Sequence, residues 1–532
     1  MSVPVTLLTW GSAAFPIGIL IFLLVARRWS VVKAAAVGTL AATVVACAVF
    51  DAPLSVISGE TGKGVWNSIS IIAVIFPAVL IYEISYEIRA FSAIQRDLTR
   101  LVPDKLLQIM AIGWCFSSFL QGPSGFGVPI AVTAPLLIGI GVKPFWAVLV
   151  PLMAHAWANT FGTLALAWEA LVQQSSLGSD LAMYWSAALW TGILTGILCI
   201  MAGTIICLFF RGSAGLRHGW PALLCIATVL AGGQLLLTQA TPTLSVVIPT
   251  TAALGAVFLL ARLPRYRSEN PAFRTSPMLT EIREAGASTV RLTLHEALLP
   301  YYVLVAVSVF VLMTPPVNNF LASWKMSFAF QETVTGYGVV NAAQPEYGPV
   351  AWLTHSGFFL LLSSLVTYGY FSSKGLIAAD GLSRIAAHTL KKSIPSAVSV
   401  MFLLVMSKIM GGSGQIGVLA AGTAKVTGQY YALLAPLVGT LGSFMSSSNV
   451  SSNILFGKFQ ESMAALTGKG TALFLAAQTS GGAVGTMFSP SKVLLGTTTA
   501  GIVGEEGNII RKLLGVSLAA AIVMGVITLI FS

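Results

Sequence analysis

Three short polar stretches interrupt long apolar sequence, and each has residue types that begin a helix. QGPSGFG (121–127) is rich in glycine, SSSNVSSN (446–453) offers hydroxyls and amides, and SPSK (489–492) places a proline directly after a serine. The first turn of a helix leaves N–H groups without partners and carries partial positive charge. Three such ends that converge would hold a small anion such as a carboxylate. The candidate binding residues are Gln121, Gly122, Ser124, Gly125, Phe126, Gly127, Ser448, Asn449, Ser451, Ser452, Asn453, Ser489 and Lys492.

Ionisable side chains inside apolar segments are candidates for function. Lys492 adds a full positive charge to the third helix start, and its alternative is an extended side chain that reaches the membrane interface. His155 lies within an uncharged stretch, 152–168, and an imidazole with an ordinary pKa of about 6.5 exchanges protons near neutral pH. Glu169, near the outer end of the same segment, is the second candidate for a proton carrier. Asn159, one turn after His155, would share its face and donate to a ligand.

For His155 the alternative is a hydrogen-bonded core residue, and for Glu169 it is an interfacial position. The segments around them belong in a membrane. The chain has 532 residues, of which 56% are hydrophobic and 9% are charged, whereas soluble domains have about 25% charged residues. The deficit extends along the whole chain, which predicts an all-α polytopic fold. About twelve segments are long enough to span a bilayer: 6–26, 31–50, 66–86, 144–169, 183–210, 220–239, 242–262, 297–314, 354–371, 394–410, 470–501 and 509–531.

The polar stretches require a different geometry from simple spans. As one helix, the uncharged segment 106–142 would be about 55 Å long, far beyond a hydrocarbon core of about 30 Å. It is predicted to form a re-entrant hairpin with arms 106–120 and 128–142. The segment 430–464 is predicted to form a second hairpin, and residues 485–492 a third break. Loop backbone at that depth requires a protein-lined or water-filled cavity.

The arginines predict the orientation. They all fall on segments that one topology places on the same side, from Arg27 to Arg511. By the positive-inside rule this side is the cytoplasm, so the loop 263–295 is cytoplasmic and both termini lie outside. The net charge of +11 then reflects topology and contact with the lipid bilayer, and no nucleic-acid partner is expected.

The two hairpins would enter from opposite faces, as in transporters built from inverted repeats. The predicted half-repeats cover about 66–210 and 394–531 of a single integral membrane domain, 1–532. The segment 87–105 alternates charged and apolar residues at helical spacing and predicts an interfacial helix or a plain connecting helix. The external loop 315–353 is expected to be partly ordered.

An enzyme is not supported by the motif fragments. GETGKG (59–64) lacks the first glycine of a phosphate loop, HEALL (295–299) lacks the second histidine of a zinc site, and GPSGF (122–126) lacks the second glycine of a nucleophile elbow. The five cysteines form no metal-binding pattern, and no cofactor or metal is expected. A channel remains an alternative, although opposed hairpins are more typical of alternating access.

Three stretches of the chain resemble the bacterial lactate permease family. They are WCFSSFLQGPSGFGVPIAVTAPLLIGIGVKPFWA (114–147), SSSNVSSNILFGKFQ (446–460) and GGAVGTMFSPSKVLLGTTTAGIVGEEG (481–507). The resemblance implies a permease of the bacterial or archaeal inner membrane that imports L-lactate, and often glycolate, together with protons.

The chain departs from the family pattern at three positions. Gln121 stands where the family often has Glu, Asn449 where Asp is frequent, and Thr486 where Lys occurs. Since these changes remove charge from the expected site, they leave open a different small organic anion or coupling to sodium.

Overall fold

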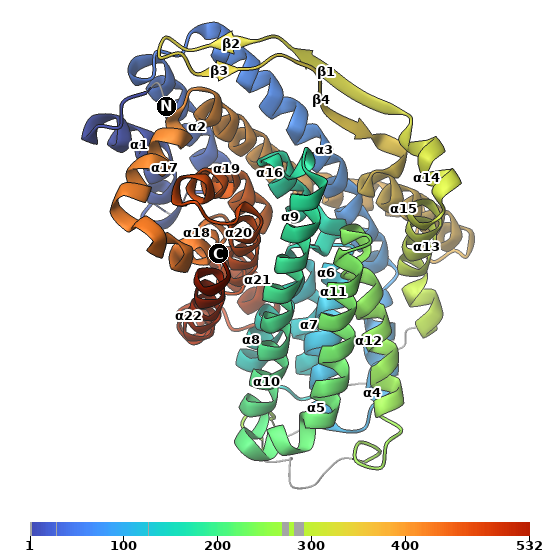
Figure 1. Cartoon of the computed structure of the whole chain (residues 1–532). Coiled ribbons are helices and arrows are strands. Elements are labelled where there is room, and N and C mark those ends of the chain that lie inside the picture. Colours follow the sequence, from blue (N-terminus) through green and yellow to red (C-terminus); the bar gives the residue numbers. More distant parts are fainter. Residues whose placement is uncertain (1–2, 28, 126, 269–275, 281–291) are drawn as a thin grey trace.

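Helices dominate the computed structural model, which describes the chain apart from residues 1–2, 28, 126, 269–275 and 281–291 (Figure 1). Within the described part, eight helices are long and apolar enough to cross a membrane. They are α1 (Leu7–Val25), α2 (Val31–Val49), α3 (Leu54–Glu87), the continuous stretch Leu181–Thr238, the stretch Pro242–Leu260, α13 (Leu294–Met313), α16 (Gly381–Gly412) and α22 (Glu506–Phe531). The predominantly helical membrane fold is therefore as predicted.

The predicted segments 183–210 and 220–239 both lie in the stretch Leu181–Thr238. Its backbone leaves the helical region at Gly212, with φ 55°, and the chain reverses there. A Cβ on Gly219 would lie only 2.8 Å from the Cys207 sulfur, so the two halves pack closely. The elements are α10 (Leu181–Ala227), η4 (Thr228–Gly232), α11 (Gly233–Thr238), η5 (Pro242–Leu244) and α12 (Val247–Leu260).

The segment 106–142 folds back on itself. One arm is α5 (Lys105–Met110), the π-helical turn η1 (Ala111–Phe116) and α6 (Ser117–Gln121), and the other is α7 (Val128–Gly139). Lys105 Nζ donates to the carbonyl of Ile140 at 3.2 Å, which brings the two outer ends together. The preceding segment forms α4 (Ala90–Leu101), which buries Phe91 and Leu98. The segment 87–105 is thus largely helical.

The predicted continuous segment 144–169 is wrong, because the chain breaks in its middle. It forms α8 (Pro144–Ala154), the 3-10 turn η2 (Ala156–Asn159) and α9 (Gly162–Gln173), followed by η3 (Ser176–Gly178). Thr163, Leu164 and Ala165 all have left-handed backbone conformations, which non-glycine residues rarely adopt. The Leu164 N–H donates to the carbonyl of Gly122 at 2.9 Å. This long-range bond stabilises the break.

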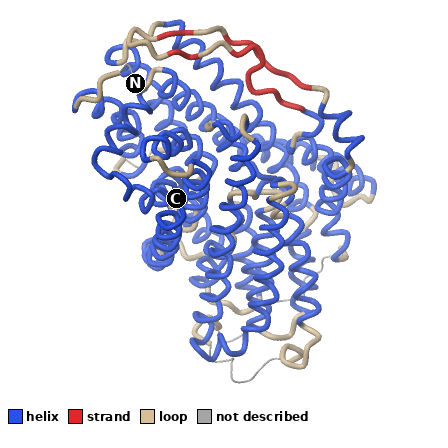
Figure 2. The backbone as a smooth tube through the Cα atoms, viewed as in Figure 1, coloured by secondary structure: helices blue, strands red, loops and turns tan. Residues whose placement is uncertain are grey.

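The loop 315–353 contains an unpredicted antiparallel β-ribbon (Figure 2). It follows α14 (Pro315–Ala322), consists of β1 (Lys325–Phe330), β2 (Thr333–Val334), β3 (Val340–Asn341) and β4 (Gln344–Ala351), and leads through η7 (Trp352–Thr354) into α15 (Ser356–Ser373). The strands pair β1 with β4 and β2 with β3. Trp66 Nε1 donates to the carbonyl of Gly348 at 2.9 Å, which fixes the ribbon on α3. Figure 1 shows the ribbon across the end of the molecule where the N-terminus lies.

The C-terminal part repeats the succession of a long helix, a hairpin, a broken helix and a final helix. Its elements after α16 are α17 (Gln415–Thr427), η8 (Gly428–Tyr430), α18 (Tyr431–Ser446), α19 (Asn449–Thr467), α20 (Thr471–Gly485), α21 (Pro490–Thr499) and α22. Tyr431 donates to Gln460 Oε1 at 3.0 Å and so joins the outer ends of α18 and α19. The segment 470–501 is interrupted between Gly485 and Pro490. The long helices α3 and α16 pack closely, since a Cβ on Gly64 would lie 2.6 Å from Val405 Cα.

Candidate functional site

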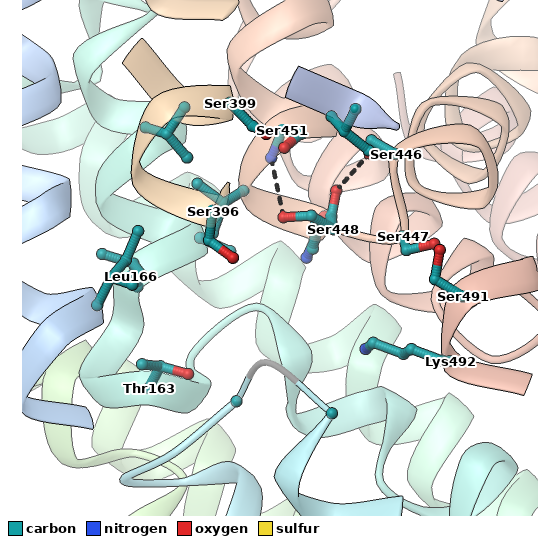
Figure 3. Close-up of a pocket in the computed structure, with 18 of the residues that line it drawn as sticks. Thr163, Leu166, Ser396, Ser399, Ser446, Ser447, Ser448, Ser451, Ser491 and Lys492 are labelled. Atoms are coloured by element: carbon teal, nitrogen blue, oxygen red, sulfur yellow. Dashed lines mark hydrogen bonds between the residues drawn. The ribbon is translucent and has the colours of Figure 1, made fainter. Parts of the chain in front are cut away.

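A cavity of about 430 Å³ lies where the three polar stretches meet (Figure 3). We call it the central cavity. Its volume is in the range of small-molecule sites. Its walls come from the first turns of α7, α19 and α21, from the break between α8 and α9, and from the middle of α16. The polar and glycine residues that line it include Ser30, Gln121, Gly125, Gly127, Asn159, Thr163, Ser396, Ser399, Ser446, Ser447, Ser448, Asn449, Ser451, Ser491 and Lys492.

Lys492 is the one ionisable side chain among the described residues that line the central cavity. It is 9% exposed, and its Nζ donates to Asn159 Oδ1 at 3.3 Å. Figure 3 shows its side chain extending from α21 into the cavity. Within the described part of the chain, no carboxylate forms an ion pair with it. A buried charge without a counter-charge is costly, so the cavity favours a negative group beside Lys492.

The first turn of α19 adds a second helix start to the cavity wall. Ser448 is its N-cap, and the Ser448 Oγ accepts from the N–H of Ser451 at 3.3 Å. Asn449 follows, and its Nδ2 donates away from the cavity, to the Thr479 carbonyl at 3.1 Å and to the Thr160 hydroxyl at 3.2 Å. Its backbone N–H belongs to the turn in which amides have no intrahelical partner. The wall therefore offers amides and hydroxyls rather than a second charge.

The glycine-rich turn forms the opposite wall. Gly127 precedes α7 with φ 87°, a conformation that favours glycine. A Cβ on Gly125 would lie 2.6 Å from Thr163 Oγ1, so the turn and the left-handed break of α9 have no space between them for a side chain. Gln121 lines the cavity next to this contact. Phe126, the remaining candidate in the turn, lies outside the described residues.

His155 lies behind the wall and does not line the cavity. Its Nδ1 is 2.6 Å from the Pro151 carbonyl oxygen and 3.2 Å from Ser117 Oγ. Asn159 stands between it and the cavity. The Asn159 Nδ2 donates to the Ala156 carbonyl at 3.0 Å and, at 3.4 Å, to that of His155. Asn159 therefore holds Lys492 through its oxygen, and since it lines the cavity its donation to a ligand stays a prediction.

Glu169 is placed on the outside of α9. Its side chain is exposed, and its Oε1 accepts from Gln173 Nε2 at 3.3 Å. It does not line the central cavity. Its role with protons, like that of His155, stays a prediction.

Five further candidates are buried but do not line the cavity: Gly122, Ser124, Ser452, Asn453 and Ser489. Ser452 and Asn453 donate to backbone carbonyls of α18 and α9, each at 2.8 Å. Ser489 is the N-cap residue of α21 and Pro490 its first residue, as predicted. However, the Ser489 hydroxyl donates back to the Thr486 carbonyl instead of capping the helix. These side chains hold the walls in place.

Sequence reasoning missed the wall that α16 provides. Ser396 and Ser399 line the cavity on this helix, and Ser399 Oγ donates to the Pro395 carbonyl at 2.7 Å. Leu166 and Ile75 add apolar surface. The available signal was Pro395 inside a predicted span with two serines beside it, which is a weaker pattern than a glycine-rich turn.

The comparisons with known proteins identify the family. The model of the L-lactate permease family matches residues 12–532. This chain belongs to the L-lactate permease family. The resemblance carried by three stretches is thereby confirmed over nearly the whole chain, and the protein is a multi-pass membrane transporter rather than an enzyme.

Several relatives cover almost the full length. The L-lactate permease of Escherichia coli (strain K12) is 28% identical over 95% of this chain and 91% of its own. The L-lactate permease of Halalkalibacterium halodurans is 26% identical over 98% and 96%, and the glycolate permease GlcA of Escherichia coli (strain K12) is 27% identical over 93% and 91%. Among solved structures, the YdaH transporter of Alcanivorax borkumensis covers 90% of this chain and 86% of its own, with 13% identity and a TM-score of 0.43.

Proposed function

We propose that this protein is a secondary transporter that imports L-lactate, or a close 2-hydroxy monocarboxylate such as glycolate, together with protons across the cell inner membrane. The observation that carries the proposal is Lys492, a buried ammonium with no counter-charge among the described residues, in a cavity bordered by three helix starts. Relatives with the names L-lactate permease and glycolate permease support the substrate class.

The carboxylate binds between Lys492 and the first turn of α19. Two opposite unit charges 4 Å apart attract by about 4 kcal/mol at an effective dielectric constant near 20. The Ser451 hydroxyl and the N–H groups of that turn supply further donors to the carboxylate. The 2-hydroxyl group faces Ser396 and Ser399, and the small apolar end of the substrate lies against Leu166. A cavity with one charge and small polar groups suits one small monocarboxylate.

His155 is the proposed proton carrier. It lies one turn before Asn159, whose Oδ1 accepts from Lys492 and whose Nδ2 donates to the backbone carbonyl of His155 at 3.4 Å. A proton on the imidazole and a carboxylate beside Lys492 leave the net charge of the site unchanged. Binding both therefore costs less electrostatic free energy than binding the proton alone. Glu169 is the second candidate.

Transport then follows from alternating access of two half-repeats, 66–210 and 394–531. The shared succession of elements supports this division, and the two folded-back segments are the proposed re-entrant hairpins. Ser30, at the start of α2 close to Arg27, lines the central cavity. In the predicted topology, with both termini outside, the cavity therefore opens toward the cytoplasm.

The test is uptake of labelled L-lactate and glycolate into proteoliposomes, with an imposed proton gradient, an imposed sodium gradient, or neither. Proton-driven accumulation of a 2-hydroxy monocarboxylate is expected. Accumulation that follows sodium alone, or transport of other organic anions in place of these two, would overturn the proposal. The neutral Gln121 in the cavity wall is the feature that favours the sodium-coupled alternative.

A further inference from the structure

A second and larger cavity, of about 670 Å³, lies beneath the β-ribbon. We call it the ribbon cavity. Strand residues including Tyr347 and Asn341 cover it, and Asn341 Nδ2 donates to the Gly412 carbonyl at 3.0 Å. Val3, near the N-terminus, also lines it. In the predicted topology this is the outer side of the membrane.

The charges that line the ribbon cavity are mostly positive. Its described lining includes Lys63, Lys408 and Lys458, against the single carboxylate Glu60. Lys63 pairs with Glu60 at 2.7 Å, and Lys458 pairs with Glu461 at 2.6 Å. Two of the three ammonium groups thus have counter-charges.

Lys408 is different from the other two lysines. Its Nζ donates to the Gln173 carbonyl at 3.1 Å and lies 5.8 Å from the centre of the Tyr347 ring. It forms no ion pair within the described part of the chain. Its exposure is intermediate, and Glu60, Glu461, Lys63 and Lys458 all lie within electrostatic range of it. Since neither carboxylate pairs with Lys408 directly, its ammonium group favours an anion in the cavity.

A buried amide beside Lys408 independently indicates a missing ligand. Gln174 lines the ribbon cavity and is 4% exposed. Its Oε1 accepts from Ser407 Oγ at 3.0 Å, but its Nε2 has no hydrogen-bond partner among the described residues. A buried donor without an acceptor is rare and requires an explanation. A bound carboxylate would supply the acceptor.

The two cavities lie in series along the same helices. Helix α16 lines the central cavity at Ser399 and the ribbon cavity at Lys408, about 14 Å further along. Helices α3, α9 and α19 do the same: each lines the central cavity with one part of its length and the ribbon cavity with another. The buried residues Leu171 and Leu404 lie between the lining positions of the two cavities along α9 and α16. A Cβ on Gly457 would lie only 3.2 Å from Leu171, so α19 and α9 meet tightly there.

We infer that the ribbon cavity is a second binding site for small monocarboxylates, at the outer mouth of the transport route, with Lys408 and Gln174 as its binding residues. The inference rests on the proposed function, because it takes the same substrate class and the same direction of transport. The β-ribbon covers the site, and the apolar layer at Leu171 and Leu404 closes it from the central cavity.

Purified full-length protein provides the test, with isothermal titration of L-lactate in detergent. Lys492→Gln is expected to lose transport and to keep one L-lactate bound per chain. Adding Lys408→Gln should remove that remaining binding, whereas adding the exposed Lys425→Gln should not. Lys408→Arg, which keeps the charge, should retain the binding and control for folding.

Transport kinetics give an independent readout. In otherwise wild-type protein, Lys408→Gln should raise KM for external L-lactate about tenfold, the effect of losing one charge-assisted hydrogen bond, and change Vmax by less than about twofold. Unchanged KM, or binding in the Lys492→Gln protein that survives Lys408→Gln, would overturn the second site while leaving the proposed function intact. Undiminished transport by Lys492→Gln would instead overturn the central site, and absence of L-lactate binding to wild-type protein would overturn both.

Discussion

The two chain reversals that border the central cavity have different chemistry. The first turn uses glycine, with Gly127 in a left-handed conformation and Gly125 packed against Thr163. The second turn is formed by Ser447, with φ 58°, and Ser448. Its carbonyl and hydroxyl groups take part in bonds, since Ser446 Oγ donates to the Ser448 carbonyl at 3.1 Å. The first turn makes a close backbone contact that requires glycine, and the second supplies a capped helix start.

The broken helices that follow the two turns also differ in the polar groups that they bring to the cavity. The break after the second turn places Lys492 in the cavity. The corresponding break after the first turn has the left-handed residues Thr163–Ala165 and places no ionisable side chain among the described residues that line the cavity. In the proposed function, the carboxylate therefore binds in the C-terminal half of the site. The N-terminal half shapes the space and holds His155.

The largest expected effect comes from removing the charge of the C-terminal half. Lys492→Gln should lower the initial rate of L-lactate uptake about 100-fold, because a charge-assisted hydrogen bond to the carboxylate and the attraction of the buried charge are both lost. The measurement is uptake into proteoliposomes, with the exposed Lys425→Gln as the matched control. Uptake by Lys492→Gln within about threefold of wild type would show that the charge of the C-terminal half does not bind the carboxylate.

The N-terminal half is tested through coupling rather than affinity. His155→Ala should abolish accumulation of L-lactate driven by a proton gradient and leave exchange of labelled for unlabelled substrate. Glu169→Gln changes the second proton-carrier candidate, on the exposed side of α9, and should lower accumulation less than His155→Ala does. If the His155→Ala protein still accumulates substrate in response to the gradient, the imidazole has no part in coupling.

The close contact between the glycine turn and Thr163 is tested by adding a side chain at Gly125. Gly125→Leu should block binding, and Gly125→Ala should raise KM about tenfold, the cost of a strained contact of roughly 1–3 kcal/mol. Because the added Cβ meets the Thr163 hydroxyl, combining Gly125→Ala with Thr163→Ala should recover most of the affinity. Unchanged KM in the Gly125→Leu protein would show that substrate does not approach this turn.

The smallest effect is expected at the serine turn. Ser448→Ala removes the side-chain cap of α19, worth about 1 kcal/mol, and should raise KM about fivefold. Ser489→Ala is the matched control, since this N-cap residue makes no side-chain bond to its helix. Equal KM values for the two variants would indicate that the capping bond of α19 is not used in binding.

The sequence predicts those helix breaks that are marked by glycine or proline at the break itself. Glycine and proline around Gly125 and the Ser489–Pro490 pair predict breaks, and the structure has them there. The break at Thr163–Ala165 was not predictable, because these residue types favour no left-handed turn and the conformation depends on the distant Gly122 carbonyl.

Other parts of the structure could not be predicted from local sequence patterns. Ser396 on α16 is brought to the cavity only by the packing of α16 against α3. The β-ribbon has strands as short as Thr333–Val334, too short for alternation to be recognised. The roles assigned to substrate and proton remain predictions because they concern molecules that bind to the fold.

The most direct test of the central claim is the distance between the substrate carboxylate and Lys492. Solid-state NMR dipolar recoupling between L-lactate with a 13C-labelled carboxyl group and 15Nζ-labelled lysine measures it in membranes. Lys408→Gln protein is used so that, among the described residues that line the two cavities, Lys492 is the one lysine without an ion pair. A 13C–15N distance within about 5 Å, as expected for an ion pair, that disappears on Lys492→Gln is the predicted result. Bound L-lactate whose carboxylate shows no coupling to any lysine Nζ would contradict the account.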